Sequence, residues 1–357
     1  MHLSAKTDHL RALLTLAAAV ALAGCASSKT TASRKVTAVS PGSGASTSEA
    51  APLAAAQLSL VVYSTPQAAY DQVIKAFQGT PQGKDITFTE SFGASGDQSR
   101  AVESGLPADV VAFSLEPDMT RLVKDGMVAS DWNAGPHGGM VTDSVVAIVV
   151  RKGNPQAIQT WADLTKPGTQ VITANPFTSG GARWNVLAAY GAASNLGKDD
   201  AAGVAYLDAL FKNVPVQDNS ARAQLQTFVG GKGDAMIDYE SDAIFAQQQG
   251  QALSYIIPDQ TLRIENPVAV TANSRHPAQA RAFLAFLYSP AAQRIFAQNG
   301  YRPVVSGLIS PTQFKTPSGL FSVAELGGWT KLNARFFDPT TGVMATIENK
   351  LGVATKK

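Results

Sequence analysis

Near the middle of the chain stands the run Asn175-Pro176-Phe177-Thr178-Ser179-Gly180-Gly181-Ala182-Arg183-Trp184. It follows a short apolar run, 171–174, that predicts a strand, and it leads into a helix that carries Leu187 and Tyr190. The first N–H groups of a helix have no partner within it and carry partial positive charge, and glycine lets a ligand approach the backbone closely. The run therefore predicts a place where backbone N–H groups and a serine hydroxyl hold an anion.

Two further segments share this design, in which small hydroxyl or glycine residues stand between a strand and a helix. The first is Tyr63-Ser64-Thr65-Pro66, with Thr65 expected as the N-cap and Pro66 as the first helical residue. The second is Gly93-Ala94-Ser95-Gly96-Asp97, which precedes a helix through Val102. An ordinary capped helix start explains each segment alone. The residues by themselves therefore leave two interpretations open, a cap and an anion site.

From residue 57 onward, β-rich runs alternate with helical ones, which predicts an α/β architecture. The expected strands are Leu58–Tyr63, Ile86–Thr89, Ala108–Phe113, Ser144–Val150, Val171–Ala174, Ala235–Ile237 and Pro267–Thr271. The expected helices include Ala182–Ala193, Asp200–Lys212, Ala221–Val229 and a pair from Pro277 to Ala297. The run 144–150 is apolar almost throughout, which is typical of a strand buried on both faces of a parallel sheet.

The amino end has the pattern of a secretion signal. Lys6 and Arg11 precede an apolar run, 13–23, that is too short to span a bilayer and is followed by small residues. Residues 1–24 are therefore expected to be a signal peptide. Leu22-Ala23-Gly24-Cys25 resembles a lipoprotein cleavage site, so we expect Cys25, the only cysteine of the 357 residues, to carry a lipid. A single cysteine excludes a disulfide framework.

Composition narrows the remaining possibilities. Residues 25–56 are rich in Ser, Thr, Ala and Gly, and we expect a flexible tether that holds the folded part at the outer face of the cytoplasmic membrane. The formal net charge is only +2, with no basic stripe that carries interleaved aromatic residues, so a nucleic-acid partner is not expected. Only His137 and His276 remain outside the signal peptide, so no metal and no cofactor are expected.

The run Thr178–Asn185 resembles the segment that marks the sulfate- and thiosulfate-binding proteins of bacterial ABC importers. Other segments resemble this family in the same order, and together they cover about residues 58 to 337. These are Phe92–Gln98, Val149–Pro155, Trp161–Leu164, Ser220–Arg222, Gly233–Ala235, Tyr288–Pro290, Tyr301–Pro303 and Gly327–Trp329.

The resemblance implies a two-lobed, class II periplasmic-binding-protein fold, with the ligand cleft between lobes joined by hinge strands. Lobe one is expected to combine residues 57–143 and 268–357, and lobe two to comprise residues 144–267. The hinges are expected near Asp143 and Asn266.

The same resemblance implies a set of ligand-binding residues. The donors are the N–H of Ser64, the N–H or hydroxyl of Ser95, the hydroxyl of Ser179 and the N–H groups of Gly180, Gly181 and Ala221. Two further residues belong to the expected site. Arg183 is expected behind it, supporting backbone carbonyls, and Tyr239 stands where the family commonly has a tryptophan that donates to the anion. Tyr239 is expected to donate its hydroxyl instead.

Such donors suit sulfate, which carries no proton at neutral pH and accepts hydrogen bonds only. Neutral donors avoid burying a counter-ion, whose desolvation costs several kcal/mol. Phosphate keeps protons and gains from a carboxylate acceptor, which repels sulfate. Asp97 is the nearest acidic residue, and its position in a first helical turn is explained by the helix dipole alone. Sulfate is favoured by the family resemblance, while thiosulfate, molybdate, tungstate and phosphate remain alternatives.

The expected partners are a membrane permease and a cytoplasmic ATPase of an ABC importer, with the receptor itself a monomer and not an enzyme. The alternative from another class is an exported hydrolase built on Ser95, with His137 or His276 as base. Gly93-Ala94-Ser95-Gly96 approaches a nucleophile elbow, but Asp97 stands where the final glycine belongs.

Overall fold

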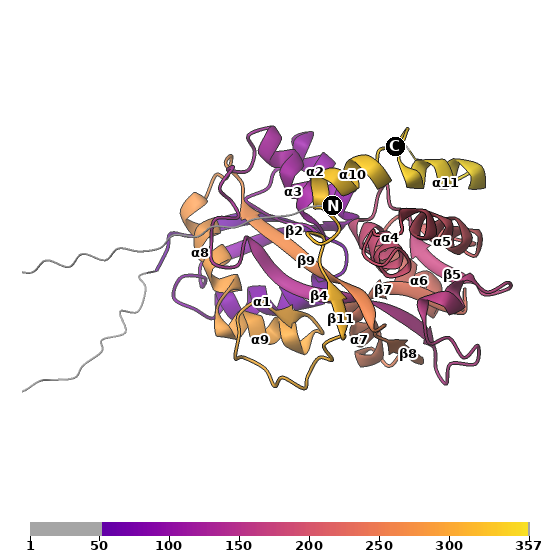
Figure 1. The fold of residues 1–357 in the computed structure, drawn as a ribbon. Helices are drawn as coiled ribbons and strands as arrows, with labels where there is room; N and C mark the ends of the chain where they lie inside the picture. The colour runs from indigo at the N-terminus through magenta and orange to yellow at the C-terminus, as the bar shows by residue number, and fades with distance from the viewer. Residues whose placement is uncertain (1–51, 356–357) are drawn as a thin grey trace, which may run out of the picture. The chain divides into compact units, whose positions relative to one another are not determined.

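The computed structural model describes residues 52–355, which belong to one compact unit. The expected signal peptide, Cys25 and nearly all of the expected tether lie outside the described residues. Within 52–355 the fold is a two-lobed α/β architecture, as expected, built on eleven strands (Figure 1). No helix in this part of the chain is long and apolar enough to cross a bilayer.

Lobe one begins with three parallel strands, each followed by a helix. In chain order these are β1 (Ala56–Tyr63), α1 (Gln67–Gln78), β2 (Ile86–Gly93), α2 (Ser95–Glu103), β3 (Val110–Ala112) and α3 (Glu116–Lys124). Their apolar positions follow the expected periods, and Leu58, Leu60 and Val62 of β1 are buried at alternate positions. Helix α1 begins at Gln67 instead of at Pro66, and Pro66 is its N-cap. The predicted cap residue Thr65 does not cap the helix, and its hydroxyl lies 3.3 Å from the Tyr301 hydroxyl.

Two long strands connect the lobes, β4 (Met140–Arg151) and β9 (Gln260–Val270). The first half of β4 pairs with β9, and its second half pairs with β7 of lobe two. The strand predicted within 144–150 is confirmed, but the predicted parallel neighbours are wrong, since β7, β8, β9 and β10 all run antiparallel to β4. The burial of β4 on both faces comes from its central place in the sheet and not from the direction of its neighbours. Asp143 lies opposite Glu265 in the antiparallel register of β4 and β9, and the hinge expected near Asp143 and Asn266 stays a prediction.

The chain between β4 and β9 supplies the elements of lobe two, and the predicted lobe boundaries stay a prediction. These elements are η1 (Trp161–Thr165), β5 (Val171–Ala174), α4 (Gly180–Ala193), α5 (Asp200–Lys212), β6 (Gln217–Asp218), α6 (Ala221–Val229), β7 (Ala235–Tyr239), α7 (Glu240–Gln248) and β8 (Leu253–Ile256). Strand β5 runs parallel to both β6 and β7. The carboxyl ends of these three strands therefore meet at one edge of lobe two.

The carboxyl-terminal segment contacts both lobes. It contains α8 (Pro277–Leu287), α9 (Pro290–Gln298), β10 (Arg302–Pro303), β11 (Gly319–Phe321), α10 (Trp329–Phe336) and α11 (Val343–Leu351). Phe283 of α8 packs edge-on against Phe77 of α1, with ring centroids 5.3 Å apart. Helix α11 instead lies against lobe two, where Lys350 is 3.6 Å from Asp208 and Glu348 accepts a hydrogen bond from Gln217 (Figure 1). Residues after about 328 thus link the two lobes on one side of the molecule.

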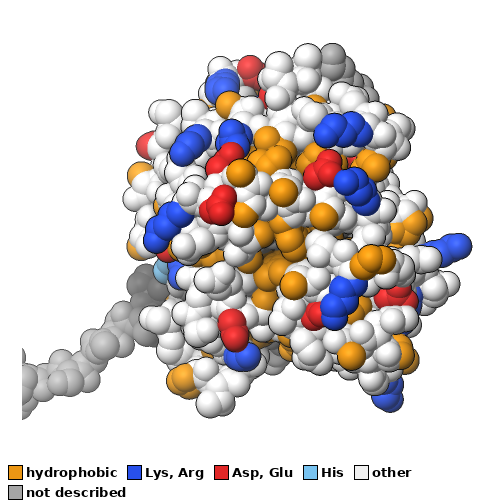
Figure 2. Space-filling model, turned by 45° about the vertical axis from the view of Figure 1, so that its right-hand side comes forward, with side chains coloured by type: hydrophobic (Ala, Val, Ile, Leu, Met, Phe, Trp, Pro, Cys, Tyr) orange, Lys and Arg blue, Asp and Glu red, His pale blue; other side chains and the backbone are white. Residues whose placement is uncertain are grey.

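The surface agrees with the near-neutral charge. Figure 2 shows Lys and Arg side chains interspersed with Asp and Glu over one face, around a band of apolar side chains. This face has no broad patch of one sign, so it offers no surface for a polyanion.

Candidate anion site

The carboxyl ends of six strands converge on one small cavity between the lobes, where α/β folds characteristically bind ligands. Lobe one contributes the residues that follow β1, β2 and β3, and lobe two contributes those that follow β5, β6 and β7. The cavity is lined by Tyr63, Ser64, Thr65, Ser95, Ser114, Ser179, Gly180, Gly181, Ala221 and Tyr239. All seven residues predicted to bind the ligand are among these ten. The structure therefore brings the predicted set together, and its contact with an anion stays a prediction.

Three helices begin at this cavity. Ser95 is the first residue of α2, Gly180 the first of α4 and Ala221 the first of α6. N–H groups in a first turn have no partner within their helix, so all three termini present donors and partial positive charge to the same small volume. The Ser179 hydroxyl caps α4 by accepting from Ala182 N at 3.3 Å, which leaves its own hydrogen for a ligand.

The two glycines let three elements meet closely. A Cβ atom added at Gly180 would lie 2.6 Å from Ser114 Oγ, and one added at Gly181 would lie 3.2 Å from Ala221 Cβ. Ordinary contacts between non-bonded atoms need about 3.5–4.0 Å. The first turn of α4 therefore approaches Ser114 of lobe one because Gly180 carries no side chain, and it approaches α6 of its own lobe because Gly181 carries none.

The Ser95 hydroxyl is occupied within the protein. It donates to Asp118 Oδ2 at 2.6 Å and accepts from Ser114 N at 2.9 Å, and all three residues are almost fully buried. Of the two donors predicted for Ser95, the hydroxyl is thus held by the buried Asp118 carboxylate. The backbone N–H remains for a ligand.

Ser114 lines the cavity but was absent from the predicted set. Its hydroxyl lies 2.7 Å from the Tyr239 hydroxyl, and its carbonyl accepts hydrogen bonds from Trp184 and Asn266. No glycine surrounds it, but a helix-start signal follows it, with Pro117, Glu116 and Asp118 in the first turn of α3. This signal and the position of Ser114 directly after an expected strand, Ala108–Phe113, were the ones available.

Tyr239 is the N-cap residue directly before α7, and it is 1% exposed. Burial raises the pKa of its phenol well above the ordinary value, so the hydroxyl keeps its proton. The phenol is therefore a neutral donor and acceptor, as the prediction requires.

No lining residue carries a charged side chain, and the charged groups around the cavity, such as Asp118 behind Ser95 and Arg222 on Thr65 O, are hydrogen-bonded to its lining residues. Arg183 lies behind the loop that precedes α4, donating from Nε to Pro176 O at 2.8 Å and from Nη1 to Asn333 Oδ1 at 3.1 Å, with its guanidinium over the Phe337 ring. This is the position that its predicted supporting role requires. Asp97 pairs with Arg100 and does not line the cavity.

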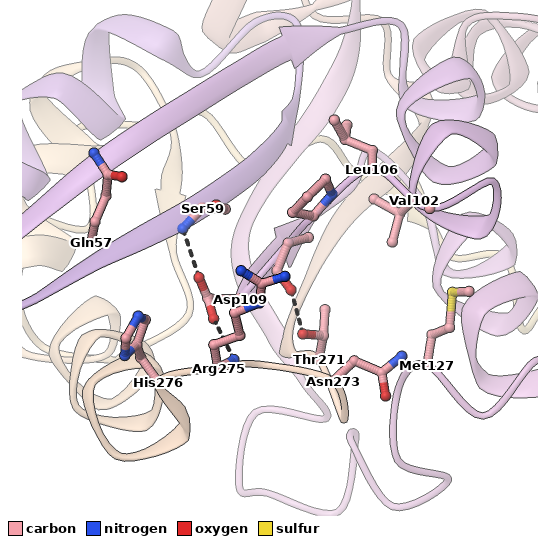
Figure 3. A pocket seen from close by; sticks show the side chains of 13 residues that line it. Gln57, Ser59, Val102, Leu106, Asp109, Met127, Thr271, Asn273, Arg275 and His276 are labelled. Atoms are coloured by element: carbon pink, nitrogen blue, oxygen red, sulfur yellow. Dashed lines mark hydrogen bonds between the residues drawn. The ribbon is translucent and has the colours of Figure 1, made fainter.

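A wider surface pocket lies at the opposite, amino ends of β1 and β3 (Figure 3). Figure 3 shows Asp109 between Ser59 and Arg275, and its carboxylate accepts from Ser59 N at 2.8 Å, Arg275 N at 3.1 Å and Ser274 Oγ at 2.6 Å. The Asp109 carboxylate, which already accepts from three donors, connects β1 to the segment that follows β9, and its negative charge repels an anion. This pocket is therefore a structural junction, and the cavity at the strand carboxyl ends remains the candidate site.

The hydrolase alternative gains nothing from the geometry. His276 lines the pocket around Asp109, at the other end of the sheet from Ser95. His137 stacks on Tyr288, with ring centroids 5.2 Å apart. Ser95 is instead hydrogen-bonded to Asp118 and Ser114. Residues 52–355 also contain no cluster of His, Cys, Asp and Glu able to hold a metal ion.

A cleft between two α/β lobes, lined by helix starts, defines a solute-binding protein of the periplasmic type, and solved periplasmic binding proteins share the fold. Residues 58–302 match the family model described as bacterial extracellular solute-binding protein. The chain belongs to this family.

Named relatives narrow the similarity further. The chain is 40% identical to a sulfate-binding protein of Synechococcus elongatus, over 79% of this chain and 83% of that one. It is 34% identical to a thiosulfate-binding protein of Pseudomonas aeruginosa, over 75% and 84% of the two chains. The solved sulfate-binding protein SubI from Mycobacterium tuberculosis H37Rv is 42% identical, with a TM-score of 0.77 over 79% of this chain and 99% of that chain.

Proposed function

We propose that this protein captures sulfate outside the cytoplasm and delivers it to an ABC importer. The observation that carries the proposal is the cavity itself, where three helix N-termini and neutral hydroxyls converge and no lining side chain is charged. Such a site spreads the two charges of sulfate over many dipoles without burying a counter-ion. The similarity to sulfate- and thiosulfate-binding proteins supports the same class of ligand.

Several hydrogen bonds join the lobes in this structure, as closure around a ligand requires. Gly96 N donates to Thr178 O at 3.2 Å, and Arg222 Nη2 donates to Thr65 O at 2.5 Å. We expect the closed form to be the one that a membrane permease recognises, with a cytoplasmic ATPase driving transport. The receptor acts as a monomer and performs no chemistry on its ligand.

Isothermal titration tests the ligand. The soluble form that starts after Cys25 is titrated with sulfate, thiosulfate, molybdate and phosphate in chloride buffer. Tight one-to-one binding of sulfate, with no heat from phosphate, supports a site of neutral donors. If another oxyanion bound in place of sulfate, the proposed role as a receptor would stand and the proposed ligand would be wrong. If none of the four anions bound, the proposal would be refuted.

The proposed anchor at Cys25 is tested separately, because that residue lies outside the described part of the chain. In the full-length protein, Cys25→Ser is expected to move the receptor from the membrane fraction to the soluble fraction. Sulfate affinity should stay unchanged, since β1, the first strand of the described residues, begins about thirty residues later. A variant that still sediments with membranes would contradict the anchor.

A further inference from the structure

Ser114 is the point at which both lobes and a connecting strand meet. Its N–H donates to Ser95 on α2, while its carbonyl accepts at 2.8 Å from Trp184 Nε1 on α4 and at 2.9 Å from Asn266 Nδ2 on β9. Both backbone polar groups are thus used within the protein. The hydroxyl is the one polar group of Ser114 that remains to face the cavity.

The position of this hydroxyl is set by the helix start beside it. Ser114 Oγ lies so close to Gly180 that a Cβ atom at the glycine would stand 2.6 Å from it. The oxygen is therefore at the N-terminus of α4, where an anion held by the Gly180 and Gly181 N–H groups has to lie. Ser114 is 2% exposed, so no competing water surrounds it in bulk.

The Tyr239 phenol stands on the other side of that hydroxyl, at 2.7 Å. The Asn266 amide also lies near the phenol, where its influence lowers the pKa of Tyr239 against the larger effect of burial. Asn266 Oδ1 accepts from Thr142 Oγ1 at 3.1 Å, which fixes the amide with its NH₂ group toward Ser114 and Tyr239. Because the amide nitrogen only donates, an amide beside the phenol oxygen leaves the phenol hydrogen free to point at Ser114 Oγ.

We propose that the Ser114 hydroxyl donates directly to the bound anion, and that Tyr239 is a positioning residue that directs the Ser114 hydrogen into the cavity. The hydrogen bonds then run in one direction, from Tyr239 through Ser114 to the anion, and the first strengthens the second. This inference rests on the proposed function. It replaces the predicted donor Tyr239 by a residue of the opposite lobe, so the arrangement is complete only when the lobes close.

A double-mutant cycle tests the order of the two hydroxyls. Ser114→Ala should weaken sulfate binding roughly 10- to 100-fold, the value of a hydrogen bond to a charged group. Tyr239→Phe should weaken it less, roughly 3- to 10-fold, because the serine hydrogen is then present but undirected. In the Ser114→Ala background, Tyr239→Phe should cost nothing further, since no hydroxyl remains to be directed.

Ser99→Ala is the matched control. Ser99 is also a fully buried serine, and its hydroxyl donates to Asp118 O at 2.7 Å without lining the cavity. The Ser99→Ala variant should bind sulfate with the affinity of the wild type. Melting temperatures without anion and dissociation rates measured by stopped flow separate a lost contact from a damaged fold. The proposal expects faster dissociation from Ser114→Ala at an unchanged melting temperature.

Each remaining outcome has one meaning. If Tyr239→Phe lost as much affinity as Ser114→Ala, or if the two losses multiplied, the assigned roles would be wrong. Should Ser114→Ala fail to fold, a loss above tenfold in Tyr239→Phe alone would still overturn the order. If the wild type bound sulfate and Ser114→Ala bound it equally well, only this inference would fall. If the wild type bound no oxyanion, the proposed function would fall with it.

Discussion

Gly180→Ala tests whether the lobes need a bare helix start in order to close. The added Cβ atom would lie 2.6 Å from Ser114 Oγ and 2.9 Å from Leu115 Cδ2, about 1 Å inside ordinary contact distances. Overpacking of this kind costs about 1–3 kcal/mol. Gly180 belongs to lobe two and Ser114 to lobe one, so the clash exists only in the closed form. Sulfate affinity should therefore fall by about 5- to 150-fold.

The same substitution should leave the unliganded protein intact. Alanine favours a helix over glycine by up to about 1 kcal/mol, and that gain applies to open and closed forms alike. The melting temperature without anion should stay level or rise, while isothermal titration shows weaker binding and small-angle X-ray scattering shows less compaction with sulfate. Gly135→Ala is the control, because nothing lies within 4 Å of its added Cβ. A Gly180→Ala protein that closes and binds within twofold of the wild type would refute the reasoning.

Three further substitutions test the surroundings of the cavity. Arg183→Met removes the hydrogen bond to Pro176 O, and the loosened loop should lower sulfate affinity roughly 3- to 20-fold by titration. Ser95→Ala leaves the Asp118 carboxylate without a hydroxyl donor, and urea unfolding should show a loss of about 2 kcal/mol. Burial raises the pKa of Glu348 to about 7, so Glu348→Gln should make unfolding less dependent on pH.

The sign for Glu348 follows from its raised pKa. The folded protein holds this carboxyl neutral, whereas the unfolded chain ionises it near its ordinary value, so the wild type loses stability as the pH rises from about 4.5 to about 7. Glu348→Gln should be more stable than the wild type at pH 8, by up to roughly 3 kcal/mol, and little different at pH 4. Glu103→Gln, at an exposed side chain, should show no such trend. Equal pH profiles of stability for Glu348→Gln and the wild type would contradict this account. Unchanged sulfate affinity in Arg183→Met would contradict the role given to Arg183, and unchanged stability in Ser95→Ala would contradict the role given to the Ser95 hydroxyl.

The helix starts of the site were predictable because their signals are local. A strand end, one serine and a glycine pair fit within ten residues, and helix geometry alone dictates what the first N–H groups do. Gly180 and Ser179 therefore lie where the sequence placed them. The same holds for α5 and α6, whose bounds match the expected ones.

Ser114 was not predictable in this way. Its role depends on Ser95, Trp184, Tyr239 and Asn266, which lie between 19 and 152 residues away in the chain. No local pattern records such contacts. The role of the Ser95 hydroxyl was missed for the same reason, because its partner Asp118 belongs to another helix.

The direction of the strands beside β4 could not be predicted from the sequence either. An apolar run such as β4 shows that a strand is buried on both faces, but it does not show which way its neighbours run. The antiparallel pairing of β4 with β9 follows from where the chain returns, more than a hundred residues later. Helices α10 and α11 were not expected at all.

The pairing of β3 with β9 also sets an order for folding. A chain that is synthesised and exported with its amino end first releases Val110 long before Val270, its partner across the two strands. Until then, β3 has an open edge, while β4, β5, β7 and β8 find one another within residues 140–256. Contacts close in sequence form sooner than distant ones. The lobe that appears first on the chain is therefore completed only after the other, once β9 has emerged as far as Val270.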